Sequence, residues 1–177
     1  VVLLSLLAVG WLLRPANEPS PTVVDEGYGL HEGDLHATLP DTAPLLREAL
    51  WNESHGERER AAALLEAIHR ADAGTPLPAI YRAIWANGSA DYEAGRDWLA
   101  LARERAAETD GLYLPLLLAY VDAELDASPE RVISTAGALL DLRPEAWRMH
   151  HARAHLMEFR SMRAAALHEL QQIQIPA

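Results

Sequence analysis

The feature that most constrains this chain is a regular succession of helical segments from residue 44 to residue 177. Apolar residues recur at helical spacing, and short breaks such as Asn87-Gly88 separate eight segments. The first segments of successive pairs are expected to begin near 44, 77, 112 and 145, and the second near 57, 91, 129 and 162. Ala (32) and Leu (29) make up about a third of the 177 residues, which favours helix over strand. The sequence therefore predicts an all-α fold of about four helix pairs with a period of about 34 residues.

The last pair carries residues that resemble a known repeat family. Ala152, Ala164 and Pro176 follow one another at intervals of twelve residues, where the tetratricopeptide repeat (TPR) has its two small residues and its closing proline. Comparable places in the first two pairs also hold small residues: Ala61 and Ala94. The third pair departs from the pattern with Arg131 near that place. The resemblance covers residues 44–177 and implies a TPR-like α-solenoid, a fold that serves protein–protein contact and names no reaction.

Residues 1–13 form an apolar segment whose one polar side chain is that of Ser5. Thirteen helical residues rise about 20 Å, whereas a bilayer core of about 30 Å requires about 20 residues. We therefore expect a transmembrane helix that begins upstream of Val1; a signal-peptide core and a buried helix are the alternatives. The side chains expected to anchor the chain are Leu3, Leu4, Leu6, Leu7, Trp11, Leu12 and Leu13, with the tryptophan at the interface.

Residues 14–43 have the composition of an extended acidic linker. Prolines and glycines punctuate them without periodicity, and no basic residue lies between Arg14 and Arg47. Because loops depleted in Lys and Arg usually lie on the non-cytoplasmic side, we expect a single-pass protein of a bacterial inner membrane with its helical domain in the periplasm. Two interpretations of the linker stay open: a flexible spacer, or an extended segment along a partner with Tyr28 and Leu30 among its contacts.

The composition excludes several functional classes. The chain carries a net charge of -11, and all 15 of its basic residues are arginine. It lacks the basic face that phosphate contacts require, so nucleic-acid binding is not expected. The absence of cysteine excludes disulfides, thiolate metal sites and a cysteine nucleophile. No glycine-rich phosphate loop or Gly-x-Ser-x-Gly motif is present, so we expect neither catalysis nor a cofactor.

His150, His151 and His155 are the residues that most suggest a metal site. His151 and His155 lie four residues apart and share a helical face, but zinc needs three or four ligands. Glu158 and His168 are the candidates to complete such a set. The alternative, which we prefer, is that the rings occupy aromatic positions of a degenerate repeat.

Three acidic residues, Asp122, Glu124 and Asp126, surround the end of the segment expected over 112–126. Alternate residues on a helix do not face one another, so an acid–base pair is not favoured. We interpret these carboxylates as a solvated helix terminus.

Tryptophans of the first helices are the candidate interaction residues. Trp51, Trp85 and Trp147 lie in the helices that line the concave face of a TPR-like array, and Arg82 and Arg148 lie beside them. Trp and Arg are the residue types most enriched in binding hot spots. Packing between helices is the alternative role for these side chains.

These features together predict a non-catalytic accessory or scaffold subunit. It would stabilise a larger membrane protein complex, for example a respiratory or photosynthetic one, from the periplasmic side. Its partners would be other protein subunits, and its N-terminal helix would contact the bilayer. The alternative is the periplasmic sensory or binding module of a membrane-anchored signalling protein, which an effector domain encoded upstream of Val1 would indicate.

Overall fold

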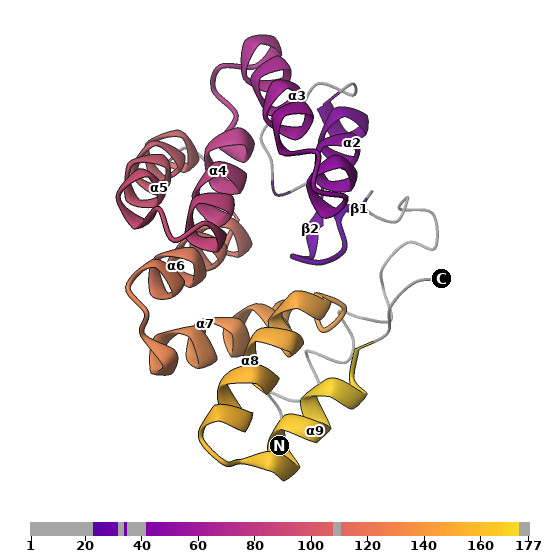
Figure 1. The fold of residues 1–177 in the computed structure, drawn as a ribbon, viewed down its shortest axis with the longest axis vertical. Coiled ribbons are helices and arrows are strands. Elements are labelled where there is room, and N and C mark those ends of the chain that lie inside the picture. The colour runs from indigo at the N-terminus through magenta and orange to yellow at the C-terminus, as the bar shows by residue number, and fades with distance from the viewer. Residues whose placement is uncertain (1–22, 32–33, 35–41, 108–110, 174–177) are drawn as a thin grey trace, which may run out of the picture.

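The computed structural model describes residues 23–31, 34, 42–107 and 111–173, and within these residues the chain is predominantly helical (Figure 1). A short antiparallel hairpin comes first, formed by β1 (Val23–Asp25) and β2 (Leu30–His31). The helices that follow are α2 (Thr42–Ser54), α3 (Arg58–Ala71), α4 (Leu77–Gly88), α5 (Tyr92–Ala106), α6 (Tyr113–Leu125), α7 (Pro129–Leu142), α8 (Trp147–Phe159) and α9 (Arg163–Gln171). Apart from the short hairpin, the predicted all-α class is confirmed for the described residues. Each helix begins within two residues of its expected position.

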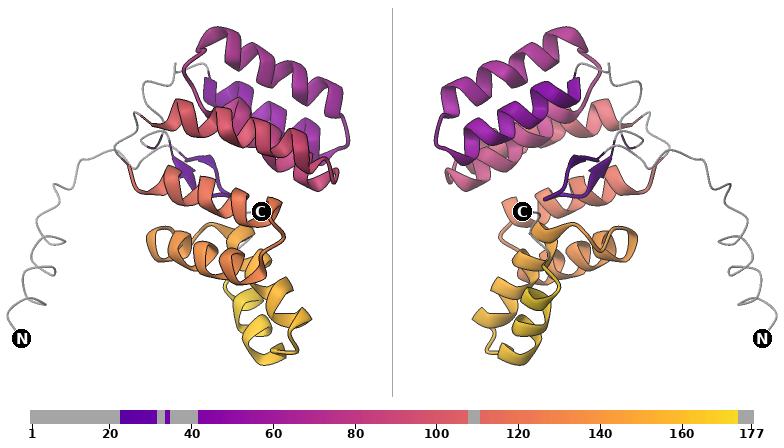
Figure 2. Two further views of the ribbon diagram at one scale, coloured as in Figure 1. Left: turned by 90° about the vertical axis from the view of Figure 1, so that its left-hand side faces the viewer. Right: turned by 90° about the vertical axis from the view of Figure 1, so that its right-hand side faces the viewer.

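The helices pack as consecutive pairs that follow one another along a curved path (Figures 1 and 2). The most extensive contacts join α2 with α3, α4 with α5, α6 with α7, and α8 with α9. Each pair also contacts the next one, and α4 packs directly on α6. One of these approaches is so close that a Cβ added at Gly95 of α5 would lie 2.6 Å from Leu125 Cδ2 of α6.

Helix α6 occupies the middle of the hydrophobic core. Its sequence is apolar nearly all round, which predicts burial on several sides. Eight of its residues are buried: Tyr113, Leu114, Leu117, Leu118, Tyr120, Val121, Ala123 and Leu125. Burial of each large apolar side chain stabilises the fold by about 1.5–3 kcal/mol, so this helix contributes a large share of the packing energy.

In each of the four pairs, the turn between the two helices contains one residue in the left-handed conformation. These residues are Gly56, Ala90, Ala127 and Ser161, with φ of 79°, 58°, 47° and 62°. In every turn, the amides of the left-handed residue and of the residue after it donate to carbonyls of the preceding helix, at 2.8–3.0 Å. This pattern is the Schellman motif, which satisfies carbonyl groups that a helix end leaves unpaired. The four turns are therefore equivalent in backbone geometry.

One helix end differs from the sequence expectation. Gly88, expected to stop the helix, is the last residue of α4, and Ala90 adopts the left-handed conformation instead. The side chain of Asp91 then accepts a hydrogen bond from the amide of Ala94 at 3.3 Å and caps α5.

The structure also differs from the expectation of an irregular linker over residues 14–43. Residues 23–31 of this segment form the hairpin, and the hairpin packs on the chain's own helices. Tyr28 is 6% exposed and Leu30 is fully buried, so both belong to the hydrophobic core. The composition did not reveal this arrangement, because glycines that permit close packing are also typical of irregular loops.

Among the described residues, no helix has the length and hydropathy needed to span a bilayer. The segment expected to form a membrane anchor, residues 1–13, lies outside the described residues. The anchor therefore stays a prediction from the sequence.

Glycine at position 90 is expected to stabilise the chain. A non-glycine residue in the left-handed conformation costs about 1–2 kcal/mol, and glycine removes most of this cost. We expect Ala90→Gly to raise the free energy of unfolding, measured with urea, by about 0.5–1 kcal/mol. The converse control is Gly56→Ala, where the added Cβ meets no heavy atom within 4 Å. It should lower stability by about 1 kcal/mol. A destabilised Ala90→Gly variant would contradict the equivalence of the turns.

Candidate functional site

The first helices of all four pairs contact the hairpin, and together they form what we call the first-helix face. Strand β1 packs on α2, and further contacts come from Tyr81 of α4, Tyr113 of α6 and Arg148 of α8. Figures 1 and 2 show the hairpin between α2 and α8, on one side of the curved array. A segment of the chain far from α8 in sequence is therefore held in contact with all four pairs.

Main-chain carbonyls of the hairpin turn are hydrogen-bonded to this face. The carbonyl of Gly27 accepts from the backbone amide of Arg148 at 3.0 Å. The carbonyl of Tyr28 accepts from the hydroxyl of Tyr113 at 2.6 Å, in a buried environment. Because the donors recognise peptide carbonyls, these contacts fix the backbone of the bound segment rather than its side chains.

Arg143, which follows α7, binds the next carbonyl group of the turn. Its guanidinium donates to the carbonyl of Gly29 and to both oxygens of Asp34, at 2.6 and 2.7 Å for the two carboxylate oxygens. The two side chains of this ion pair are only 17% and 9% exposed. The guanidinium also lies 4.2 Å from the ring centroid of Tyr113. A bidentate pair of this kind adds both energy and geometric specificity.

The glycines on either side of Tyr28 are required by the close approach. A Cβ at Gly27 would lie 2.8 Å from Arg148 Nε. A Cβ at Gly29 would lie 2.6 Å from the hydroxyl of Tyr113, and the residue has a φ of +63° that favours glycine. The Gly-Tyr-Gly sequence therefore fits the surface beneath it.

Asp25 fixes the start of the turn. Its carboxylate accepts from the amide of Gly27 at 2.8 Å and from the hydroxyl of Tyr81 at 2.5 Å. The rings of Tyr28 and Tyr81 meet edge to face with centroids 6.3 Å apart. Burial, together with the nearby Asp25 carboxylate, raises the pKa of Tyr81 well above its usual value, so its hydroxyl stays a donor.

Arg148 lies at the centre of the face and between aromatic rings. Its guanidinium carbon lies 5.1 Å from the centroids of both Tyr28 and Trp147. Its Nε atom is buried without a hydrogen-bond partner among the described residues. Arg148 is therefore held by the faces of two rings and by its charge, and it lines two neighbouring cavities.

These two cavities flank the hairpin. The larger has a volume of about 320 Å³ and is lined by Asp25, Glu26, Gly27, Arg47, Leu50, Trp147 and Arg148. The smaller has a volume of about 170 Å³ and is lined by Tyr28, Leu50, Glu53, Arg58, Tyr81, Ile84, Trp85, Gly88 and Arg148. Both combine aromatic walls with arginine, the composition typical of interaction hot spots.

The residues predicted from sequence for interaction divide into two groups. Tyr28, Trp85, Trp147 and Arg148 come together around the hairpin. Trp51 and Arg82 do not line these cavities.

The two outlying residues have contacts of their own. Trp51 is 55% exposed and stacks on His55 with centroids 4.0 Å apart. Arg82 pairs with Glu66 at 3.0 Å and lies 4.5 Å from the ring centroid of Trp98. Arg82 therefore connects neighbouring helices, whereas Trp51 offers an open aromatic surface.

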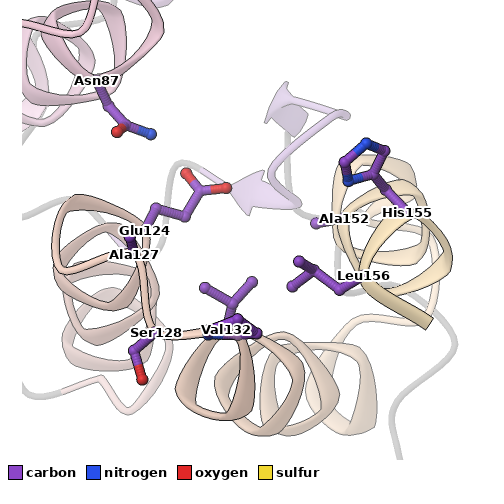
Figure 3. A pocket seen from close by; sticks show the side chains of 9 residues that line it. Asn87, Glu124, Ala127, Ser128, Val132, Ala152, His155 and Leu156 are labelled. Carbon is purple, nitrogen blue, oxygen red and sulfur yellow. The ribbon is translucent and has the colours of Figure 1, made fainter. Parts of the chain in front are cut away.

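A third cavity lies between α4, α6, α7 and α8, close to the hairpin (Figure 3). Its volume is about 320 Å³, and it is lined by Asn87, Glu124, Ala127, Ser128, Pro129, Val132, Ala152, His155 and Leu156. Figure 3 shows the carboxyl group of Glu124 pointing into it. The walls are mainly apolar, and the polar groups are few, as in most ligand-binding cavities.

The interpretation of Glu124 as part of a solvated helix end is wrong. Asp122 and Asp126 follow the expectation, since both pair with the exposed Arg131, at 2.7 and 2.9 Å. Glu124 points instead into the third cavity and accepts from the hydroxyl of Tyr120 at 2.6 Å. Burial raises the pKa of Glu124, and the bond from Tyr120 and the charge of Arg148 offset only part of this effect.

The three histidines do not form a metal site in the part of the chain that the structure describes. His150 is buried, with Nδ1 2.8 Å from Glu169 Oε2 and Nε2 3.0 Å from the carbonyl of Pro144. His151 and His155 are exposed. No group of three or more metal-ligating side chains is present among the described residues. His150 thus ties α8 to α9, since Glu169 also pairs with Arg153 at 3.1 Å.

Sequence reasoning missed the charged residues that hold the hairpin and the carboxyl group in the third cavity. Asp25, Asp34 and Arg143 come together only through the fold, and 109 positions separate Asp34 from Arg143. The one local signal was the Gly-Tyr-Gly sequence, in which two glycines flank an aromatic residue.

Comparison with known proteins gives no assignment: no protein-family model, no curated protein and no solved structure matches this chain. Its function is therefore inferred from the geometry of its surfaces. That geometry consists of donors aimed at peptide carbonyls, aromatic rings beside arginine, and a cavity with a single carboxyl group.

Alanine at position 29 should destabilise the chain through the hairpin. It introduces a left-handed non-glycine residue and a contact of 2.6 Å with the Tyr113 hydroxyl, which disrupts the bond to the Tyr28 carbonyl. We expect Gly29→Ala to lower the free energy of unfolding by about 2–3 kcal/mol, against about 1 kcal/mol for Gly56→Ala. Faster hydrogen exchange should appear at residues 25–31. Equal effects of the two substitutions would contradict a tightly fitted turn.

Glutamine at position 124 should change how stability depends on pH. Because the pKa of Glu124 is raised in the folded state, the wild type loses stability as the pH rises from about 4.5 through that raised pKa. The glutamine amide keeps the bond from Tyr120 and stays neutral. Urea unfolding should therefore give equal stabilities near pH 4 and a more stable Glu124→Gln variant near pH 8. Glu158→Gln, at an exposed position of α8, should show no such difference. A Glu124→Gln variant that is less stable than the wild type at pH 8 would contradict burial of the carboxylate.

Proposed function

We propose that this chain is a non-catalytic protein-interaction module that acts as an accessory or scaffold subunit of a larger membrane assembly. One observation carries the proposal: the first-helix face and the adjacent Arg143 hold the hairpin turn through three consecutive main-chain carbonyls, those of residues 27–29. A surface that binds the backbone of a segment of its own chain has the kinds of donors and apolar cavities needed to bind a partner's polypeptide beside that segment.

A TPR-like α-solenoid is the fold that we propose for residues 44–177. The first helices begin at 42, 77, 113 and 147, and the second at 58, 92, 129 and 163. The four equivalent turns recur at the same relative place in each pair, as expected of one repeated unit. Stacked helix pairs generate the extended binding surfaces that repeat proteins use.

Exposed apolar side chains on the last pair favour a partner protein as well. Phe159 is 85% exposed, and Met162, Leu167 and Leu170 are 50%, 58% and 46% exposed. Side chains of this size gathered near one end of an array are typical of a surface that another protein covers.

The N-terminal sequence is the basis for placing this chain in a membrane assembly. The apolar segment 1–13 supplies an anchor, and the acidic segment after it favours the periplasmic side of a bacterial inner membrane. The same features suit a periplasmic sensory module, which is the second candidate. Both candidates use the first-helix face for binding, and they differ in whether an effector domain precedes residue 1.

Charge reversal at Arg47 should separate the chain from its assembly. Arg47 is exposed and lines the cavity beside Trp147 and Arg148. We expect Arg47→Glu to weaken association at least tenfold, which corresponds to about 1.4 kcal/mol. The measurement is the size of the native species extracted from its own membrane in mild detergent, with mass spectrometry of the proteins present.

The matched control is Arg163→Glu, which reverses the charge of an exposed arginine on α9, away from the first-helix face. It should leave the large species intact. A wild-type chain that migrates as a monomer, or equal behaviour of both variants, would contradict the proposed function.

A further inference from the structure

The cavity between α4, α6, α7 and α8 contains a carboxyl group that forms no ion pair with the described residues. Glu124 uses Oε1 to accept from Tyr120, and no hydrogen-bond donor in the described part of the chain reaches its Oε2. Burial raises the pKa of the group, and the hydrogen bond from Tyr120 and the charge of Arg148 offset only part of this effect.

The arginines on the surrounding helices are engaged elsewhere. Arg131 of α7 pairs with Asp122 and Asp126 on the outer surface. Arg148 and Arg153 of α8 lie against Tyr28 and Glu169, respectively. Arg160, which follows α8, pairs with Glu130. Among the described residues, no arginine of α7 or α8 forms an ion pair with Glu124, and the charge of Arg148 acts on this carboxyl group only from a distance.

The rest of the cavity suits an alkyl chain. Its apolar lining consists of Ala127, Pro129, Val132, Ala152 and Leu156. Polar side chains, those of Asn87, Ser128 and His155, complete the lining (Figure 3). A volume of about 320 Å³ lies at the lower end of the range for ligand cavities and accommodates a four-carbon stem.

On these grounds we propose that the cavity binds a lysine side chain of the partner polypeptide, with its methylenes on the apolar walls and its ammonium group on Glu124 Oε2. The proposal rests on the proposed function, because the lysine belongs to a protein bound on the first-helix face. Residues 1–177 contain no lysine, which agrees with a side chain supplied by a bound polypeptide.

Lysine fits this cavity better than arginine does. A guanidinium binds a carboxylate best through two parallel hydrogen bonds to its two oxygens. One oxygen of Glu124 already accepts from the hydroxyl of Tyr120, at 2.6 Å. An ammonium group is a compact point charge that needs only the remaining oxygen.

The cavity is placed to receive such a side chain from a polypeptide on the face. Glu124 belongs to α6 and His155 to α8, the two first helices that also hold the hairpin turn. Figure 3 shows the hairpin strands behind the cavity, between the ends of α6 and α8. A partner segment bound along α6 and α8 beyond the hairpin would therefore lie against two of the helices that line the cavity.

The test uses n-butylammonium as a probe that reproduces the lysine side chain. The full chain is titrated in mild detergent, and the methyl resonances of Val132 and Leu156 are followed by NMR. We expect saturable shifts at about millimolar concentrations, since the probe has about five non-hydrogen atoms. 1-Butanol, which has the same alkyl chain without the charge, should bind at least tenfold more weakly, and n-propylguanidinium should also bind more weakly.

Two variants connect these shifts to the site. Glu124→Gln should reduce n-butylammonium binding at least tenfold, whereas Glu158→Gln, at an exposed position of α8, should leave it unchanged. Ala152→Leu fills the cavity without altering the carboxyl group and should abolish the shifts, with folding of each variant checked by its urea transition.

Three results would overturn the proposal. The first is the absence of saturable shifts in the wild type. The second is equal binding of 1-butanol, which would make the cavity an apolar site only, and the third is tighter binding of n-propylguanidinium. Dissociation of the native assembly by Arg47→Glu is measured independently. If n-butylammonium did not bind but Arg47→Glu still dissociated the assembly, the lysine site would be excluded and the proposed function would remain.

Discussion

Hydrogen bonding to three consecutive peptide carbonyls, at residues 27–29, is the constraint on which the rest of this structure depends. Peptide carbonyls removed from water must find donors, and here the donors come from α6, α8 and the connection before α8. These bonds hold Tyr28 and Leu30 in the core, where their apolar surface joins all four helix pairs. The hairpin therefore links the first helix pair to the last one. Contacts along a repeat array otherwise run only between neighbouring pairs, whereas this segment connects α2 with α8 directly.

The sequence predicts the helices well because their signals are local. Pro129 marks the start of α7 and Asp91 the start of α5, and apolar periodicity supplies the lengths. The TPR-like resemblance rests on the same periodicity and stays a proposal. What the sequence does not reveal depends on residues distant in the chain. Ala90 adopts a left-handed conformation because the Schellman hydrogen bonds outweigh its preference. Glu124 is shielded from water by neighbouring helices, and these cannot be placed from the residues around position 124.

The candidate site divides into an occupied part and an open part. The occupied part is the hairpin, with its acidic residues Asp25 and Asp34 satisfied by Tyr81 and Arg143. The open part is the set of three cavities beside it, which Arg47, Trp147 and Glu124 help to line. Charged groups of both signs line two of these cavities, and a single carboxyl group lines the third. Under the proposed function, such groups would favour bound segments of complementary charge.

The equivalent turns determine where this fold tolerates a change in length. From the start of a first helix to the start of its second, the chain uses 15 or 16 residues in every pair. From a second helix to the next first helix it uses between 18 and 21. Variation is thus confined to the connections between pairs, and the connections within pairs are constant. Insertions during evolution would accumulate at the former, where an added residue alters the rotation from one pair to the next. The curvature of the first-helix face is then adjusted by a few residues that lie outside it.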